Sequence, residues 1–306
     1  MDQRIENLNY SGKAEKPQVS IGMPVHNGAK FIRGALDSLL SQTFTDFELI
    51  ISDNASTDDT EAICCEYVAK DKRIRYVRQK KNLGAVANFK YVLDEAVAEY
   101  FMWASSDDMW DKNWLATLYP VAKENKCLAF GTIRTIDEMD QILRHPANNR
   151  LFSYSGVKLL RRIKYALEPN SLGKANPIYG VFPKKVINEE AINLLSSGLY
   201  AADTLFLYCI LKQCEIKGNK EVYIYKRIHQ DCASLNSQIP SNIICLYANL
   251  KNCVQLSVPL ERFLIIALFP FTSVYYMAIQ GLNDVYAMAI QALNLLGRVF
   301  ARNSGK

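Results

Sequence analysis

The 306-residue sequence has no cysteine pair with the spacing of a metal-binding or redox motif. Its eight cysteines include no C-x-x-C and form no cluster with histidine that would indicate a zinc site. We therefore expect reduced thiols that pack as small apolar side chains in a cytoplasmic protein. The polar N-terminal stretch 1–18 has no apolar core of the kind found in secretory signals, which favours the same location.

Long blocks of one charge are also missing. The net charge of +5 is spread along the chain, and no basic run is interleaved with aromatic residues, so we expect no nucleic-acid partner. With 49% apolar and 22% charged residues, the composition is that of a globular protein large enough to bury a substantial core.

The usual phosphate-binding loops are absent as well. Neither G-x-x-x-x-G-K-[ST] nor G-x-G-x-x-G follows the first apolar run, so the ATPase and dinucleotide-binding classes lose their main support. A diphosphate bound to this chain would need another source of positive charge, such as a divalent cation.

Short apolar runs alternate with helical patterns along the first 125 residues. We predict strands at 19–25, 47–53, 74–78 and 99–104, with helices near 31–42, 54–70, 86–98 and 112–124. Ser56 with Asp59 fits a capping box at the start of the second helix. This alternation indicates an α/β fold with a mostly parallel sheet covered by helices on both faces.

The second half of the chain is less regular. We predict a strand and turn at 176–187, a helix at 200–215, and a strand at 221–229. The stretch 263–279 has no charged residue but contains Pro270, and basic residues outnumber acidic ones over 257–306. Two interpretations stay open for 257–306: peripheral contact with the cytoplasmic face of a membrane, or packing on the domain or on a sister subunit.

Three acidic residues follow predicted strands. Asp53 ends the second strand, and Asp107 and Asp108 follow the fourth. Ligands of open parallel sheets bind beyond the carboxyl ends of the strands, where these acids are expected to meet. Carboxylate oxygens bind hard cations together with phosphate oxygens, so the pattern indicates a cation and diphosphate site.

These motifs resemble family 2 glycosyltransferases, which are inverting nucleotide-sugar transferases with the GT-A fold. The resemblance rests on four segments in the family's order and spacing, namely VSIGMPVHNGAKFI (19–32), FELIISDNASTDDT (47–60), RQKKNLGAVANF (78–89) and WASSDDMW (103–110). It implies a GT-A domain over 18–235, with a donor-binding half (18–125) and an acceptor half (126–235). An N-terminal extension (1–17) and a helical, apolar C-terminal region (236–306) would flank it.

The resemblance also assigns donor-binding residues. It places Pro24, Val25 and Asn27 against the nucleotide, Asp53 and Asn54 at the nucleobase, Asn82 and Gly84 in a nearby loop, and Ser106 and Asp107 beside the diphosphate. The donor would be a sugar linked to UDP, GDP or dTDP, and the acceptor a glycan or a lipid-linked glycan.

The family's metal-binding acids match this chain only in part. Asp107 and Asp108 align with acids that hold Mg²⁺ or Mn²⁺, and His229 aligns with a late histidine that some relatives bring to the metal. Ser105 stands where relatives have a further aspartate, which leaves one fewer carboxylate. The resemblance further implies that Asp203 is the base that deprotonates the acceptor hydroxyl.

Two other functions remain open at this point. A nucleotidyltransferase of similar fold would make the activated sugar and release pyrophosphate, although Gly28 and Lys30 alone are a poor triphosphate loop. A non-catalytic subunit that binds nucleotide sugar or serves as a scaffold would keep the fold and lose the chemistry, and Ser105 is its best support.

Overall fold

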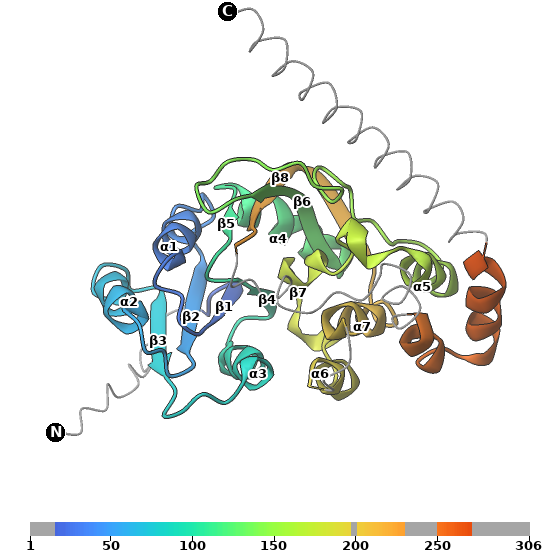
Figure 1. Ribbon diagram of the computed structural model, residues 1–306, viewed down its shortest axis with the longest axis horizontal. Coiled ribbons are helices and arrows are strands. Elements are labelled where there is room, and N and C mark those ends of the chain that lie inside the picture. The colour runs from blue at the N-terminus through green and yellow to red at the C-terminus, as the bar shows by residue number, and fades with distance from the viewer. Residues whose placement is uncertain (1–15, 197–200, 230–249, 271–306) are drawn as a thin grey trace, which may run out of the picture.

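The computed structural model describes residues 16–196, 201–229 and 250–270, so most of the predicted N-terminal extension and part of the C-terminal region lie outside the described residues. The first half alternates strands and helices as predicted (Figure 1). Its elements are β1 Val19–Val25, α1 Ile32–Leu40, β2 Phe47–Asp53, α2 Thr60–Val68, β3 Ile74–Arg78, α3 Ala85–Glu95, β4 Tyr100–Trp103, β5 Met109–Trp110 and α4 Trp114–Asn125.

The larger sheet has the strand order β3-β2-β1-β4-β7. Its first four strands are parallel, and the short β7 (Phe182–Pro183) joins β4 in antiparallel orientation. Helices α1 and α2 lie on one face and α3 on the other (Figure 1). Because both faces are covered, every residue of β2 is buried, from Phe47 to Asp53, including the polar Glu48 and Ser52.

The strand order reverses at β1. Chain connections leave β1 toward β2 and β3 and then return on its other side to β4. At such a switch point the loops after the two neighbouring strands diverge and leave a crevice at the carboxyl ends. In this protein the switch point lies between the end of β1, at Val25, and the loop after β4, which contains Asp107, and we refer to this region as the crevice.

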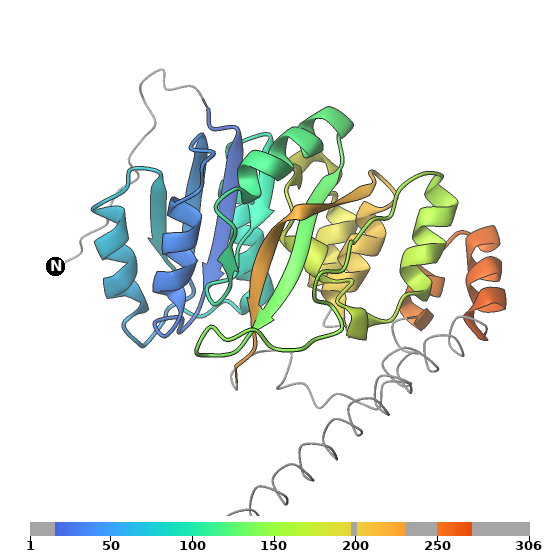
Figure 2. The ribbon, with the colours of Figure 1, turned by 90° about the horizontal axis from the view of Figure 1, so that it is seen from above.

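A second sheet, formed mainly by the second half of the chain, has the order β5-β8-β6. The elements of this half are β6 Leu128–Ile136, α5 Lys158–Leu167, η1 Asn170–Leu172, η2 Asn176–Tyr179, β7, η3 Lys184–Val186, α6 Glu189–Leu195, α7 Ala202–Ile210 and β8 Ile216–Arg227. The long strands β6 and β8 cross the middle of the molecule (Figure 2). Since β8 pairs with β5, the chain around residue 225 is brought beside the acidic loop that precedes β5.

Three local predictions differ from the structure. The capping box is wrong, because α2 begins after Asp59 without a side-chain cap, and Ser56 Oγ instead accepts from the Asn27 N–H at 2.9 Å. The strand and turn at 176–187 is mostly two 3₁₀ turns around the two-residue β7. The long strand β6 was not predicted.

The described part of the C-terminal region is helical and packs on α5 and α7. Arg162 in α5 forms a buried ion pair with Glu261 at 2.5 Å, and the Tyr208 hydroxyl in α7 hydrogen-bonds to Ser257 at 2.6 Å. Within residues 16–196, 201–229 and 250–270, no helix combines the length and apolar character needed to cross a bilayer.

Candidate active site

The ends of β1 and β2 are tied together at the crevice. Val25 and Asp53 are register partners in the sheet, and the Asn54 N–H donates to the Val25 carbonyl at 2.8 Å. Asn27 has a positive φ of 52°, and its side-chain oxygen accepts from the Thr57 N–H at 2.8 Å. The predicted nucleotide-binding residues Pro24, Val25 and Asn27 therefore lie on one rim with Asp53.

Asp53 is fully buried at the end of β2. Its Oδ1 accepts from the Ser56 N–H at 2.8 Å, and its Oδ2 accepts from the Tyr76 hydroxyl at 2.7 Å. Burial, followed by the hydrogen bond to Asp53, raises the pKa of Tyr76 well above its usual value. Arg78 Nε also lies 3.8 Å from Oδ2, and the Asp53 side chain has no exposed surface, so a nucleobase N–H could reach this carboxylate only if Arg78 moved.

A second loop joins this rim through asparagine side chains. The Asn54 side-chain amide donates to Asn82 Oδ1 at 2.9 Å, and Asn82 Oδ1 also accepts from the Gly84 N–H at 2.8 Å. Gly84 has a φ of +84°, a conformation that other residues adopt only with strain. The structure thus brings Asn54 to Asn82 and Gly84, which lie 28 and 30 residues further along the chain.

Asp107 faces the histidine at the end of β8. Its Oδ2 lies 3.0 Å from His229 Nε2, and the Ser105 hydroxyl hydrogen-bonds to its Oδ1. Burial opposes ionisation of this carboxyl, but the charge of Lys226 and the hydrogen bonds from Ser105 and His229 outweigh it and lower the pKa. Asp107 is therefore a carboxylate at neutral pH, as a cation ligand must be.

Asp108, in contrast, is fully buried and points into the protein. Lys226 Nζ donates to its Oδ2 at 2.7 Å, and the Arg227 N–H donates to its Oδ1 at 2.9 Å. Burial and the neighbouring Asp107 raise the pKa of Asp108 to about 6 despite Lys226. For Asp108 to hold a cation as predicted, Lys226 would have to release Oδ2.

The residues present fit a divalent cation that takes most of its ligands from substrate. Within the described parts of the chain, no three His, Cys, Asp or Glu side chains gather at one point. Mg²⁺ sites commonly use one or two carboxylates and complete their coordination with substrate phosphate oxygens and water. Asp107 and His229 provide two neighbouring ligand atoms at the crevice, which suits a cation bound together with a diphosphate.

Asp203 lies in the first turn of α7. Its Oδ1 accepts from the Thr204 N–H at 2.7 Å. Burial raises the pKa of Asp203, although the Thr204 N–H and the charge of Lys226 act in the opposite direction. A carboxylate with a raised pKa is a better proton acceptor at neutral pH, as a general base requires.

The sequence analysis missed two basic residues of the site. Arg227 donates from Nε to the Asp107 carbonyl at 2.9 Å and from Nη1 to the Asp137 carbonyl at 2.7 Å, which fixes the acidic loop. Lys226 pairs with Asp108 and stands over the Tyr179 ring at 4.6 Å. Their sequence signal was their place at the end of a predicted strand, three and two residues before His229.

The tryptophans near the acidic loop belong to the core. Trp103, Trp110 and Trp114 are all buried, so none presents a face to a sugar.

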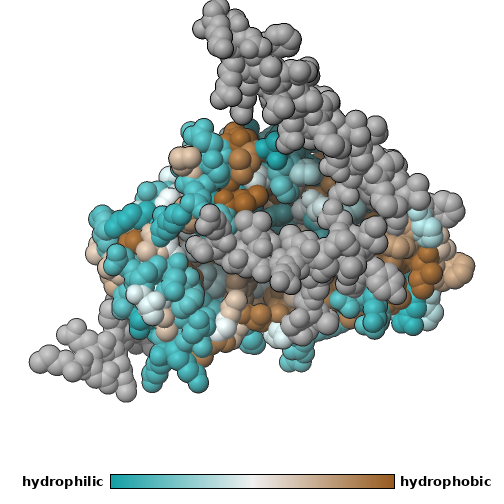
Figure 3. All heavy atoms as spheres, viewed as in Figure 1, coloured by the Kyte–Doolittle hydropathy of each residue, from teal (hydrophilic) through white to brown (hydrophobic). Residues whose placement is uncertain are grey.

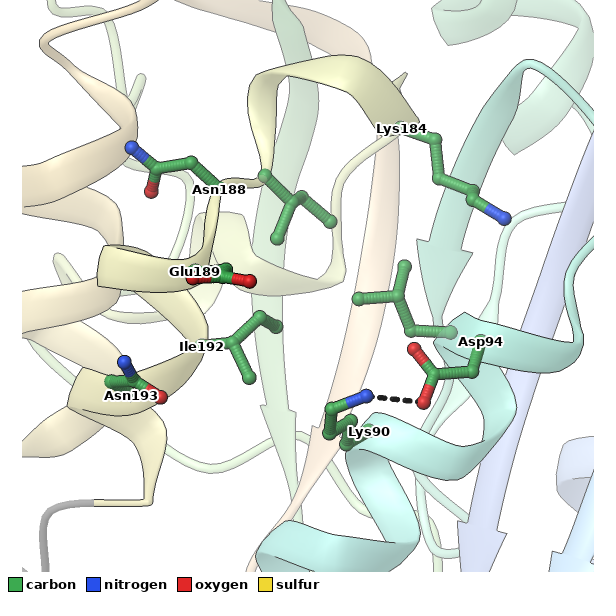
Figure 4. A pocket seen from close by; sticks show the side chains of 9 residues that line it. Lys90, Asp94, Lys184, Asn188, Glu189, Ile192 and Asn193 are labelled. Carbon is green, nitrogen blue, oxygen red and sulfur yellow. Dashed lines mark hydrogen bonds and ion pairs between the residues drawn. The ribbon is translucent and has the colours of Figure 1, made fainter.

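A surface hollow lies elsewhere, between α3 and α6, and includes Lys90 and Lys184 (Figure 4). The Lys184 N–H donates to the carbonyl of Glu99, which directly precedes β4. The hollow therefore lies near the amino end of β4, whereas Asp107 follows its carboxyl end.

The model of the family described as "Glycosyl transferase family 2" matches residues 20–181, which is more than half of the chain. The chain belongs to glycosyltransferase family 2. The predicted membership and the GT-A-type α/β fold are thereby confirmed.

Relatives in this family come from several bacteria. A glycosyltransferase of Rickettsia felis is 28% identical over 71% of this chain, which spans 35% of that protein's length. Glycosyltransferase GlyG of Streptococcus pneumoniae is 25% identical over 68% of this chain and 70% of its own. A Campylobacter jejuni protein, named GalNAc(5)-diNAcBac-PP-undecaprenol beta-1,3-glucosyltransferase, is 25% identical over 72% of this chain and 68% of its own.

Among solved structures, Staphylococcus aureus TarS 1–349 in complex with UDP-GlcNAc superposes with a TM-score of 0.58 at 22% identity. The match covers 83% of this chain and 72% of that one. At this identity the likeness shows the shared family 2 fold.

Proposed function

We propose that this family 2 protein transfers a sugar from a nucleoside diphosphate to an acceptor hydroxyl with inversion at the anomeric carbon. The observation that carries the proposal is the arrangement at the crevice. The Asp107–His229 pair lies on the donor side, and Asp203, whose pKa burial raises, lies near enough for the charge of Lys226 to act on both carboxyl groups.

The donor-side residues would bind and orient the nucleotide. Asp53 would accept a nucleobase N–H, with Asn54, Asn82 and Gly84 shaping that end of the crevice and Ser106 beside the diphosphate. Asp107 and His229, and Asp108 if Lys226 moves, would hold Mg²⁺ or Mn²⁺, which supplies positive charge to the leaving diphosphate. The binding of UDP-GlcNAc by TarS supports a UDP-linked donor, while GDP- and dTDP-linked sugars are further candidates.

Asp203 would take the proton of the acceptor hydroxyl. The acceptor oxygen then forms its bond to the anomeric carbon from the face opposite the diphosphate. The bond from that carbon to the phosphate oxygen breaks, and the nucleoside diphosphate leaves with the bonding electrons. The product has the inverted configuration, and the proton remains on Asp203 until it passes to solvent.

The acceptor is proposed to be a glycan or a lipid-linked glycan in cell-surface polysaccharide synthesis at the cytoplasmic face of the membrane. The printed name of the Campylobacter jejuni relative, which describes transfer to an undecaprenol-linked oligosaccharide, supports this class.

A donor screen tests the proposal. Purified protein is incubated with UDP-, GDP- and dTDP-sugars, Mn²⁺ and glycan acceptors, and the released nucleoside diphosphate is measured. We expect release with one donor, and a loss of about 10²–10⁴-fold in kcat for Asp203→Asn with unchanged donor affinity. Pyrophosphate release from a sugar phosphate and NTP would contradict the proposal, and so would near-normal turnover by Asp203→Asn.

A further inference from the structure

The helix formed by residues 259–270 has apolar side chains on two opposite faces. Its inner face packs on the protein through Ile265, which is fully buried, and through the ion pair of Glu261 with Arg162. Its outer face carries Leu260, Phe263 and Ile266, which are 60%, 66% and 56% exposed, at the three-residue spacing of one helix side. Val258, 59% exposed, directly precedes the helix. We call these four residues the exposed stripe.

Within residues 250–270, the charges that reach the surface all have one sign. Residues 250–270 contain three charged side chains, and the only acid, Glu261, is buried in its ion pair. The two that reach the surface, Lys251 and Arg262, are basic. Arg262 also donates to the Val254 carbonyl at 3.1 Å, which fixes its charge beside the stripe. Apolar residues beside exposed basic ones, without exposed acids, are typical of helices that lie in the interface of an anionic bilayer.

The sequence beyond this helix has the same character. No residue from Phe263 to Asn283 is charged, and the last three charges of the chain, Arg298, Arg302 and Lys306, are basic. In Figure 3, brown spheres gather at the end of the molecule where this helix lies in Figure 1.

The stripe is connected to the candidate active site by one short helix. Ser257, next to the stripe, bonds to Tyr208 in α7, and Asp203 stands five residues earlier in the same helix, or about 8 Å along its axis. A surface that contacts the stripe is therefore held close to the acceptor side of the crevice.

We propose that the exposed stripe is an interfacial docking surface for an anionic lipid bilayer. Phe263, Ile266 and Leu260 would insert among the lipid headgroups and acyl chain ends, and Arg262 and Lys251 would contact anionic headgroups. The docking does not depend on which sugar is transferred, or on whether transfer occurs. If the proposed function is correct, it brings the crevice to the surface that presents lipid-linked acceptors.

Flotation of the full chain with vesicles tests the docking surface. Vesicles of phosphatidylcholine alone are compared with vesicles that also contain phosphatidylglycerol. We expect Phe263→Gln with Ile266→Gln to lower the partition coefficient by at least about tenfold, since two large apolar side chains are lost from the contact. Arg262→Gln should lower binding to the anionic vesicles by about fivefold and leave binding to neutral ones unchanged.

A matched control removes two equally exposed apolar residues elsewhere. Met139 and Ile142, 76% and 64% exposed after β6, are changed to Gln together, and this variant should bind vesicles as the unmodified chain does. Equal binding by the stripe variant and the unmodified chain would overturn the proposal. A second result would also overturn it: the unmodified chain does not bind vesicles and is a dimer in sedimentation velocity, and the stripe variant is a monomer. Because flotation needs no substrate, failure of docking and failure of sugar transfer are seen separately.

Discussion

Removal of the Lys226 charge should destabilise the protein through Asp108. The two side chains are 2.7 Å apart, Asp108 is fully buried, and Lys226 is about a quarter exposed, at 26%. Lys226→Met would leave a buried carboxylate with the Arg227 N–H as its remaining partner. Breaking a buried pair from one side costs about 3–5 kcal/mol, and the partial exposure of Lys226 places this pair near about 3 kcal/mol.

The loss should also depend on pH. The pKa of Asp108 is raised to about 6 in the folded protein, above its value in the unfolded chain, so the folded state holds this proton to higher pH. Without Lys226 that pKa rises further. At pH 5 Asp108 is then protonated and the missing partner costs little, whereas at pH 8 it must be charged and the full cost applies.

Urea unfolding followed by the fluorescence of the three buried tryptophans measures this effect. At pH 8 we expect the midpoint of Lys226→Met to fall by about 1–1.5 M for a slope of about 2–3 kcal/mol/M. Lys226→Met with Asp108→Asn should recover much of the loss, because no buried charge remains. A variant within about 0.5 kcal/mol of the unmodified protein at pH 8, or a loss equal at pH 5 and pH 8, would refute the reasoning.

Three further predictions concern the base, the C-terminal helix and the donor loop. In the pH profile of kcat/KM, the apparent pKa of the acidic limb should lie above the usual range of aspartate, because burial raises the pKa of Asp203 and its protonated form cannot accept the acceptor proton. An apparent pKa in the usual range of aspartate would contradict this. Arg162→Met should lower stability by about 3–5 kcal/mol in urea unfolding, since Glu261 is left buried and unpaired, and Arg162→Met with Glu261→Leu should restore most of it; an additive double variant would count against the pair. Gly84→Ala should lower the stability by about 1–3 kcal/mol and weaken nucleotide binding in calorimetry, because its φ of 84° and ψ of 157° are open almost only to glycine; unchanged binding would remove Gly84 from the donor loop.

The strands and helices of the first half could be anticipated because their signals are local. Most strands of the first half are short runs rich in apolar residues, and helical patterns with a period of 3.6 residues alternate with them. The carboxyl ends of parallel strands meet at one edge, so the ends carrying Asp53 and Asp107 were expected to lie together, and the structure places both at that edge.

The partners of the site residues could not be anticipated. Asp108 is 118 residues away from Lys226, and only the antiparallel pairing of β5 with β8 brings the two together. The sequence shows two adjacent acids and cannot show that one faces a histidine while the other is buried against a lysine. Ser56 failed as a cap for a similar reason, because its hydroxyl binds the Asn27 N–H, 29 residues away, instead of its own helix.

Nucleotide calorimetry tests the central claim most directly. UDP, GDP and dTDP are titrated with and without Mn²⁺ into the unmodified chain, Asp107→Ala and Asp203→Asn. If Asp107 and His229 hold the diphosphate through a cation, one nucleotide binds in the presence of Mn²⁺, Asp203→Asn binds it equally well, and Asp107→Ala loses it. Binding by Asp107→Ala at the affinity of the unmodified chain would contradict the account, as would the absence of binding of all three nucleotides.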